Sequence, residues 1–106
     1  MIDIIIPTYN NKQGLIKTLN SLPKNNNFTI TIIDDCSTQD IDYSDIINQY
    51  TLLQMPMNSG PGNVRQYGID RTKEPYIMFV DTGDFLLPFD IISIIKNYSQ
   101  IDIFSF

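Results

Sequence analysis

Short apolar runs alternate along the chain with segments whose apolar residues recur at helical spacing. The runs are rich in β-branched residues and are nearly continuous, which predicts strands that are buried on both faces. Five such runs are present, at 2–6, 28–33, 51–55, 76–80 and 101–106. Strands of this kind belong to parallel sheets whose two faces are covered by helices.

Four segments between these runs have the spacing of helices. In the first, Leu15, Leu19 and Leu22 recur at i, i+4 and i+7, and in the last, Pro88 stands where a first helical turn is expected. The expected helices are 12–22, 40–50, 64–72 and 88–99. Strict alternation of strand and helix predicts an α/β fold, with a Rossmann-like, mostly parallel sheet flanked by helices, in one domain over 1–106.

Polar and turn-forming residues follow four successive predicted strands. These segments are PTYNN (7–11), DDCSTQD (34–40), PMNSGPGNVR (56–65) and DTGD (81–84). In open α/β sheets, ligands bind beyond the carboxyl ends of the strands, near the point where the strand order reverses. The four segments therefore predict one binding site at this edge of the sheet.

Composition narrows the class of ligand. With 106 residues, 42% hydrophobic and 18% charged, the chain is long and apolar enough to fold as one domain. A net charge of −5 and the lack of a Lys/Arg run argue against nucleic-acid binding. A phosphate ligand would need a local cation, backbone N–H groups or a metal to offset this negative field.

The residue types that the sequence lacks exclude some kinds of cross-link and metal site. The chain has no His, and Cys36 is its single cysteine, so an internal disulfide and a cysteine metal cluster are excluded. The N-terminal segment has no basic region, and its apolar run is too short for a signal peptide or a membrane span. We expect a cytoplasmic protein, with any membrane anchor outside these residues.

Asp34 and Asp35 follow the second predicted strand directly. A carboxylate here can accept hydrogen bonds from a base N–H or from ribose hydroxyls, or it can cap the next turn. We expect Asp35 to contact the ligand and Asp34 to have the structural role.

The segment GPGNVR admits two interpretations. Either the loop with Gly60 and Gly62 brings backbone groups and Arg65 close to a diphosphate, or Arg65 is solvated or paired with a nearby Asp. The segment also approaches the dinucleotide-binding fingerprint, since Asp81 follows Gly60 at about the offset of its acidic residue. However, Arg65 replaces the third glycine of that fingerprint. A dinucleotide-binding domain is the weaker alternative.

Asp81 and Asp84 close the fourth predicted strand with D-x-x-D spacing. They are candidates for metal ligands, ribose ligands or turn caps. Oxygen ligands suit Mg²⁺ or Mn²⁺, but two carboxylates alone do not complete either coordination sphere. A bound diphosphate and waters would have to supply the rest.

Taken together, these segments resemble the N-terminal half of a family 2 glycosyltransferase with the A-type nucleotide-diphospho-sugar transferase fold. The resemblance covers essentially the whole chain, and its segments are IIIPTYN (4–10), IIDDCSTQD (32–40), NSGPGNVRQYGI (58–69) and YIMFVDTGDFLLP (76–88). It implies transfer of a sugar, with inversion, from a donor that is usually UDP-linked. It also implies Mg²⁺ or Mn²⁺ and a product such as a cell-surface polysaccharide.

The resemblance also implies roles for individual residues. Pro7, Thr8 and Tyr9 would line the nucleoside pocket, Asp35 would hold the base, and Asp34, Gly60 and Gly62 would belong to the same donor site. Arg65 would lie near the donor, and Asp81 near the ribose or the sugar. Asp81 and Asp84 would hold the metal.

The chain departs from the family pattern in ways that matter for function. Cys36 replaces a glycine, and Gly83 replaces the second acid of D-x-D, which puts the metal geometry in question. Family members continue beyond the fifth strand into an acceptor-binding half that carries the catalytic base, so no catalytic residue is assigned here. A non-catalytic nucleotide-sugar-binding module is therefore the alternative function. Because segment 101–106 would end the sheet in an uncovered apolar strand, we expect self-association through it.

Overall fold

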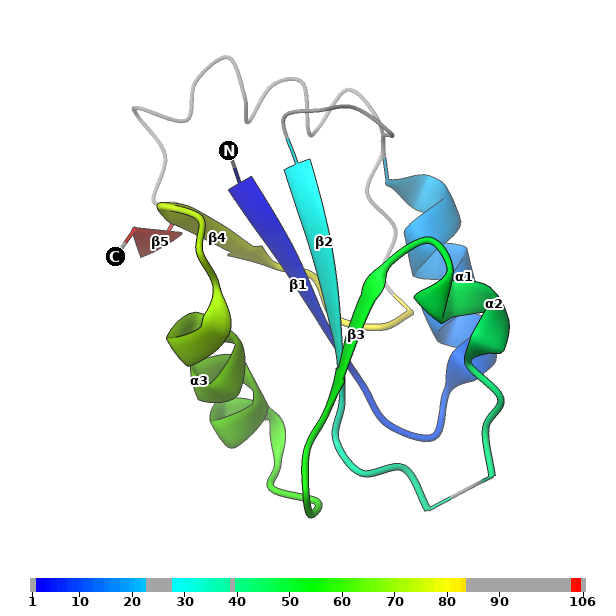
Figure 1. The fold of residues 1–106 in the computed structure, drawn as a ribbon. Helices are drawn as coiled ribbons and strands as arrows, with labels where there is room; N and C mark the ends of the chain where they lie inside the picture. The colour runs from blue at the N-terminus through cyan, green and yellow to red at the C-terminus, as the bar shows by residue number, and fades with distance from the viewer. Residues whose placement is uncertain (1, 23–27, 39, 84–103, 106) are drawn as a thin grey trace.

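A computed structural model of the chain describes residues 2–22, 28–38, 40–83 and 104–105 (Figure 1). These residues form one sheet in the order β3-β2-β1-β4-β5. The first four strands are mutually parallel, and the short β5 pairs antiparallel with β4. The strands are β1 (Ile2–Thr8), β2 (Phe28–Asp34), β3 (Thr51–Gln54), β4 (Tyr76–Phe79) and β5 (Phe104–Ser105).

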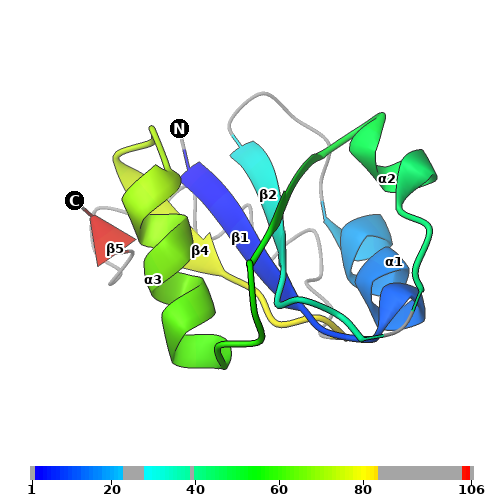
Figure 2. The same ribbon diagram turned by 60° about the horizontal axis from the view of Figure 1, so that its bottom comes forward.

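Helices cover both faces of this sheet. Helices α1 (Lys12–Ser21) and α2 (Ser44–Ile47) lie on one face, and α3 (Pro61–Arg71) lies on the other (Figure 2). No helix in the described ranges is long and apolar enough to cross a membrane.

Alternating side chains of the strands build a separate core on each face. Towards α1 and α2, Ile4 and Ile6 pack with Leu15 and Leu19, whereas towards α3 the core is formed by four residues. Those four are Ile5, Ile33, Val64 and Ile77. The continuous apolar runs of the sequence are explained by this two-sided burial.

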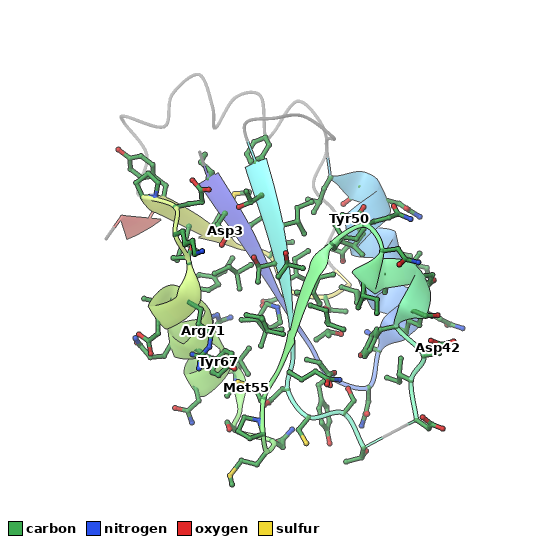
Figure 3. All side chains as sticks on the ribbon, in the orientation of Figure 1. Asp3, Asp42, Tyr50, Met55, Tyr67 and Arg71 are labelled. Carbon is green, nitrogen blue, oxygen red and sulfur yellow. The ribbon has the colours of Figure 1, made fainter. Side chains whose placement is uncertain are left out.

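Asp3 is the one charged residue within the apolar run of β1, and it is buried at 5% exposure. Its carboxylate accepts hydrogen bonds from the hydroxyls of Thr31 on β2, at 3.0 Å, and of Thr72, which follows α3, at 2.8 Å. Figure 3 shows Asp3 on β1, well away from the carboxyl ends of the strands. These bonds join the central strand to its neighbour and to the end of α3.

The predicted α/β class with a Rossmann-like, mostly parallel sheet is confirmed, and the element bounds differ in detail. Helix α3 begins at Pro61 rather than at residue 64, because proline is well suited to the first turn of a helix. Helix α2 covers only 44–47 of the expected 40–50. The expected helix 88–99 lies outside the described residues, as does most of the expected strand 101–106.

Candidate functional site

A cavity of about 310 Å³ opens at the carboxyl ends of β1 and β4. Strand β1 has β2 on one side and β4 on the other, so the strand order reverses at this point, where open α/β sheets bind ligands. The lining residues are Pro7, Thr8, Tyr9, Asn11, Asp35, Pro61, Val64, Asp81 and Thr82. Loops that are far apart in the sequence therefore meet around one space.

Five of the residues that the sequence singled out line this cavity: Pro7, Thr8, Tyr9, Asp35 and Asp81. The remaining four that the structure describes, Asp34, Gly60, Gly62 and Arg65, are outside the lining. Of these, Gly60 and Arg65 bond directly to lining residues.

Asp35 is both a lining residue and a tie between two loops. It is 7% exposed, and its two carboxylate oxygens accept the backbone N–H groups of Ser59, at 2.9 Å, and Gly60, at 3.0 Å. Gly60 is the N-cap of α3, and a negative charge is stabilised at the N-terminal end of a helix. The carboxylate therefore holds the loop before α3 against the end of β2.

The same contacts argue against the dinucleotide-binding alternative. In that fingerprint, N–H groups at a helix N-terminus hold the pyrophosphate. Here the N–H groups of Ser59 and Gly60 already donate to Asp35, and Pro61 has none. The glycine-containing turn also follows β3. The strand order reverses between β1 and β4, whereas β3 lies at the edge of the sheet, beyond β2.

Asp34 has the structural role that was expected for it. It is 2% exposed and accepts hydrogen bonds from the backbone N–H of Ser37, at 3.1 Å, from the Ser37 hydroxyl, and from the Tyr43 hydroxyl, at 3.0 Å. The Ser37 oxygen in turn accepts the backbone N–H of Asn10 at 2.9 Å. This network joins the loops after β1 and β2 beside Tyr9, whose side chain is 43% exposed.

Tyr43 belongs to this network although the sequence analysis did not single it out. Burial raises the pKa of its hydroxyl to about 12, and the neighbouring Asp34 carboxylate adds to that shift. The hydroxyl is therefore a proton donor to Asp34 across the physiological pH range.

Cys36 adopts a left-handed backbone conformation, with φ of 56°. Side chains disfavour this region, and glycine enters it without penalty. The structure thus gives a physical reason to prefer glycine at this position, and it indicates that Cys36 is strained.

Asp81 is exposed and pairs with Arg65 of α3, at 3.3 Å between Nη2 and Oδ1. The Arg65 guanidinium also lies 5.8 Å from the centre of the Phe79 ring. An exposed ion pair of this kind contributes little to stability, so its partners exchange readily for a ligand. Of the two interpretations of Arg65, the pairing with a nearby Asp is the one present here.

The metal ligands predicted from the sequence are only partly described. Asp84 lies outside them, so the predicted pair of Asp81 and Asp84 stays a prediction. Within the described ranges, no cluster of three or more Asp, Glu, His or Cys side chains is arranged to hold a metal. Asp81 is an exposed carboxylate beside the cavity, which fits a hard cation that takes most of its ligands from a bound phosphate and water.

Four lining residues belong to the predicted strand-end segments but were not singled out individually: Asn11, Pro61, Val64 and Thr82. Asn11 and Pro61 carry a detectable signal, since both stand at helix starts, where Asn is a common cap and Pro a common first residue. Val64 and Thr82 carry no such signal, apart from their place in the polar segments that follow predicted strands.

Comparison with known proteins gives a family match over nearly the whole chain. The model of the family described as Glycosyl transferase family 2 matches residues 3–102. The poly(ribitol-phosphate) β-N-acetylglucosaminyltransferase TarS of Staphylococcus aureus strain Mu50 is 31% identical over 94 residues. That alignment covers 78% of this chain and 16% of TarS, so the chain spans about a sixth of the length of this relative.

Solved structures agree with the fold. The S. aureus TarS structure of residues 1–349 in complex with UDP has a TM-score of 0.72 and 26% identity, over 92% of this chain and 32% of that one. The mannosyltransferase PcManGT of Pyrobaculum calidifontis, in complex with GDP-Man and Mn²⁺, has a TM-score of 0.77 and 13% identity. This match covers 95% of this chain and 32% of that one, and it shows the fold alone.

Proposed function

Because the chain belongs to glycosyl transferase family 2, we propose that it is the donor-binding part of an enzyme that transfers a sugar from a UDP-linked donor to an acceptor hydroxyl, with inversion. The observation that carries this proposal is the cavity at the reversal of strand order, lined by Tyr9, Asp35 and Asp81. The TarS structure, which contains UDP, supports the choice of nucleotide.

Thr8 adds a physical reason to expect a polar ligand in this cavity. The residue is 3% exposed, and its buried hydroxyl has no hydrogen-bond partner among the described residues. Buried hydroxyls in folded proteins almost always have a partner. A ligand in the cavity that Thr8 lines would supply one.

We assign the roles within the donor site as follows. Tyr9, with its exposed ring, stacks on the base, and the free lone pairs of Asp35 accept a base N–H. Arg65 releases Asp81 and binds the diphosphate, whose negative charge grows as the sugar departs. Asp81 then turns to the ribose or to the sugar.

Asp81 and Asp84 would together hold Mg²⁺ or Mn²⁺, which supplies further positive charge to the diphosphate. An inverting transfer also needs a base that takes the proton of the attacking hydroxyl. The described residues include no candidate for that base, and we assign it to a part of the enzyme outside this chain. Because TarS is a poly(ribitol-phosphate) β-N-acetylglucosaminyltransferase, we propose a polyol-phosphate polymer as the acceptor.

Calorimetry with UDP, UDP-sugars and NAD tests the donor site directly. We expect UDP to bind in the presence of Mn²⁺ and NAD not to bind. Binding of NAD, or no binding of UDP by a folded protein, would contradict the proposal. If UDP binds but the full-length protein transfers no sugar from any UDP-sugar, the chain is a non-catalytic nucleotide-sugar module instead.

Arg65 provides a sharper test, because α3 carries a matched control. Arg65→Ala is expected to weaken UDP binding roughly tenfold, the effect of losing one charge-assisted contact to phosphate. Arg71→Ala removes the same charge at the other end of α3, where the guanidinium lies 3.4 Å from the centre of the Tyr67 ring (Figure 3). If both variants bind UDP equally well, Arg65 does not contact the diphosphate.

A further inference from the structure

Thr18 is a buried polar residue on the apolar face of α1. It is fully buried, at 0% exposure, and it follows Leu15 by three residues and precedes Leu19 and Leu22, which pack in the core. A hydroxyl in such surroundings is costly unless it is hydrogen-bonded. An aliphatic side chain would fill this position without that requirement.

The Thr18 hydroxyl accepts a hydrogen bond from a distant part of the chain. Its oxygen lies 2.9 Å from the backbone nitrogen of Gly83, in the turn that follows β4. Gly83 has φ of 98°, and a Cβ added there would meet nothing within 4 Å. Glycine is therefore required at this position by backbone conformation rather than by lack of space.

Three elements hold the three residues of this turn. The Thr82 hydroxyl donates to the carbonyl oxygen of Pro7 at the end of β1, at 2.6 Å, and Asp81 pairs with Arg65 of α3. The hydrogen bond from the Gly83 N–H to the Thr18 hydroxyl ties the turn to α1 as well. The pair of Asp81 and Arg65 is exposed and exchangeable, so the two hydrogen bonds fix the backbone of the turn.

We propose that Thr18 is a positioning residue for the donor site, although it is far in sequence from Asp81 and Thr82, the two lining residues in the turn after β4. Its hydroxyl fixes the peptide between Thr82 and Gly83 and thereby holds Asp81 at the mouth of the cavity. This inference rests on the proposed function, because it is UDP binding that the ordered turn serves.

Thr18→Val tests the inference, since valine has nearly the same shape and suits the apolar surroundings but accepts no hydrogen bond. UDP affinity in the presence of Mn²⁺ is expected to fall about three- to tenfold, the effect of one hydrogen bond. Thr18→Ser keeps the hydroxyl and is expected to bind UDP like the parent. The matched control is Thr31→Val, which removes a threonine hydrogen bond to buried Asp3 far from the cavity.

The amide exchange of Gly83, followed by NMR, reports on the bond itself. We expect protection of this amide in the parent and in Thr18→Ser, and its loss in Thr18→Val. An unprotected Gly83 amide in the parent would overturn the inference even if Thr18→Val failed to fold.

The outcomes separate the inference from the proposed function. Equal UDP affinity of Thr18→Val and the parent, or equal losses of UDP affinity in Thr18→Val and Thr31→Val, would overturn the positioning role alone. A folded parent that binds no UDP would overturn the proposed function and this inference with it.

Discussion

Replacing Asp35 by alanine should destabilise the fold as well as the donor site. The side chain is 7% exposed, and its two oxygens accept the N–H groups of Ser59 and Gly60. Alanine would leave both N–H groups without their acceptor at the start of α3. It would also remove the negative charge that this helix end favours.

The magnitude follows from the two bonds. A hydrogen bond to a charged group contributes about 1.5–3 kcal/mol. In the variant, water can reach part of this loop and offsets part of the loss. We therefore expect Asp35→Ala to lower the free energy of unfolding by about 2–4 kcal/mol. For a domain of about 100 residues, this corresponds to a fall in Tm of roughly 10–25 °C.

Urea unfolding followed by far-ultraviolet circular dichroism measures this loss. The matched control is Asp70→Ala, which removes an equal charge from the exposed side of α3, where Asp70 accepts a hydrogen bond from Gln66 at 2.9 Å. The control is expected to change stability by less than about 0.5 kcal/mol. Equal stability of the Asp35 and Asp70 variants would refute the structural role of Asp35.

Two further predictions concern Cys36, which follows Asp35 in the chain, and Tyr43, which bonds to Asp34. Cys36→Gly should raise the free energy of unfolding by about 0.5–1 kcal/mol, because glycine relieves the left-handed backbone at φ of 56°; Cys36→Ala in the same urea assay should bring no gain. Tyr43, with its pKa raised to about 12, should contribute a constant stability below pH 10, and this contribution should be lost from pH 10 to 12, where only the unfolded chain loses the proton. Tyr43→Phe should lack this alkaline loss, on the order of 2 kcal/mol, and an unchanged profile would exclude Tyr43 as its cause.

Local patterns in the sequence were sufficient to predict the four parallel strands and the edge of the sheet that carries the cavity. A central strand of a covered parallel sheet is buried on both faces, so an apolar run such as the one in β1 is expected whichever strands lie beside it. That Asp34 and Asp35 bond to different parts of the structure also follows in part from position, since residues at the end of β2 alternate between its two faces. The structure adds that Asp35, too, holds a loop.

The contacts that shape the turn after β4 could not be predicted in this way. The bond between Thr18 and Gly83 and the pair of Arg65 and Asp81 join segments that no local pattern relates. The antiparallel direction of β5 depends in the same way on contacts distant in sequence. The strain at Cys36 is a backbone property, which only the resemblance to a glycine-containing pattern could have indicated.

The central place of β1 in the sheet has a consequence for synthesis of the protein. The ribosome delivers β4 about 70 residues after its partner β1, an interval of roughly 4–14 s at ordinary rates of translation. During that interval, one edge of an isoleucine-rich strand has no partner and is open to pairing with other nascent chains. Asp3 interrupts the apolar run with a charge, which opposes such aggregation until Thr31 and Thr72 enclose it. The soluble yield of an Asp3 variant would therefore reflect events on the ribosome as well as the stability of the finished fold.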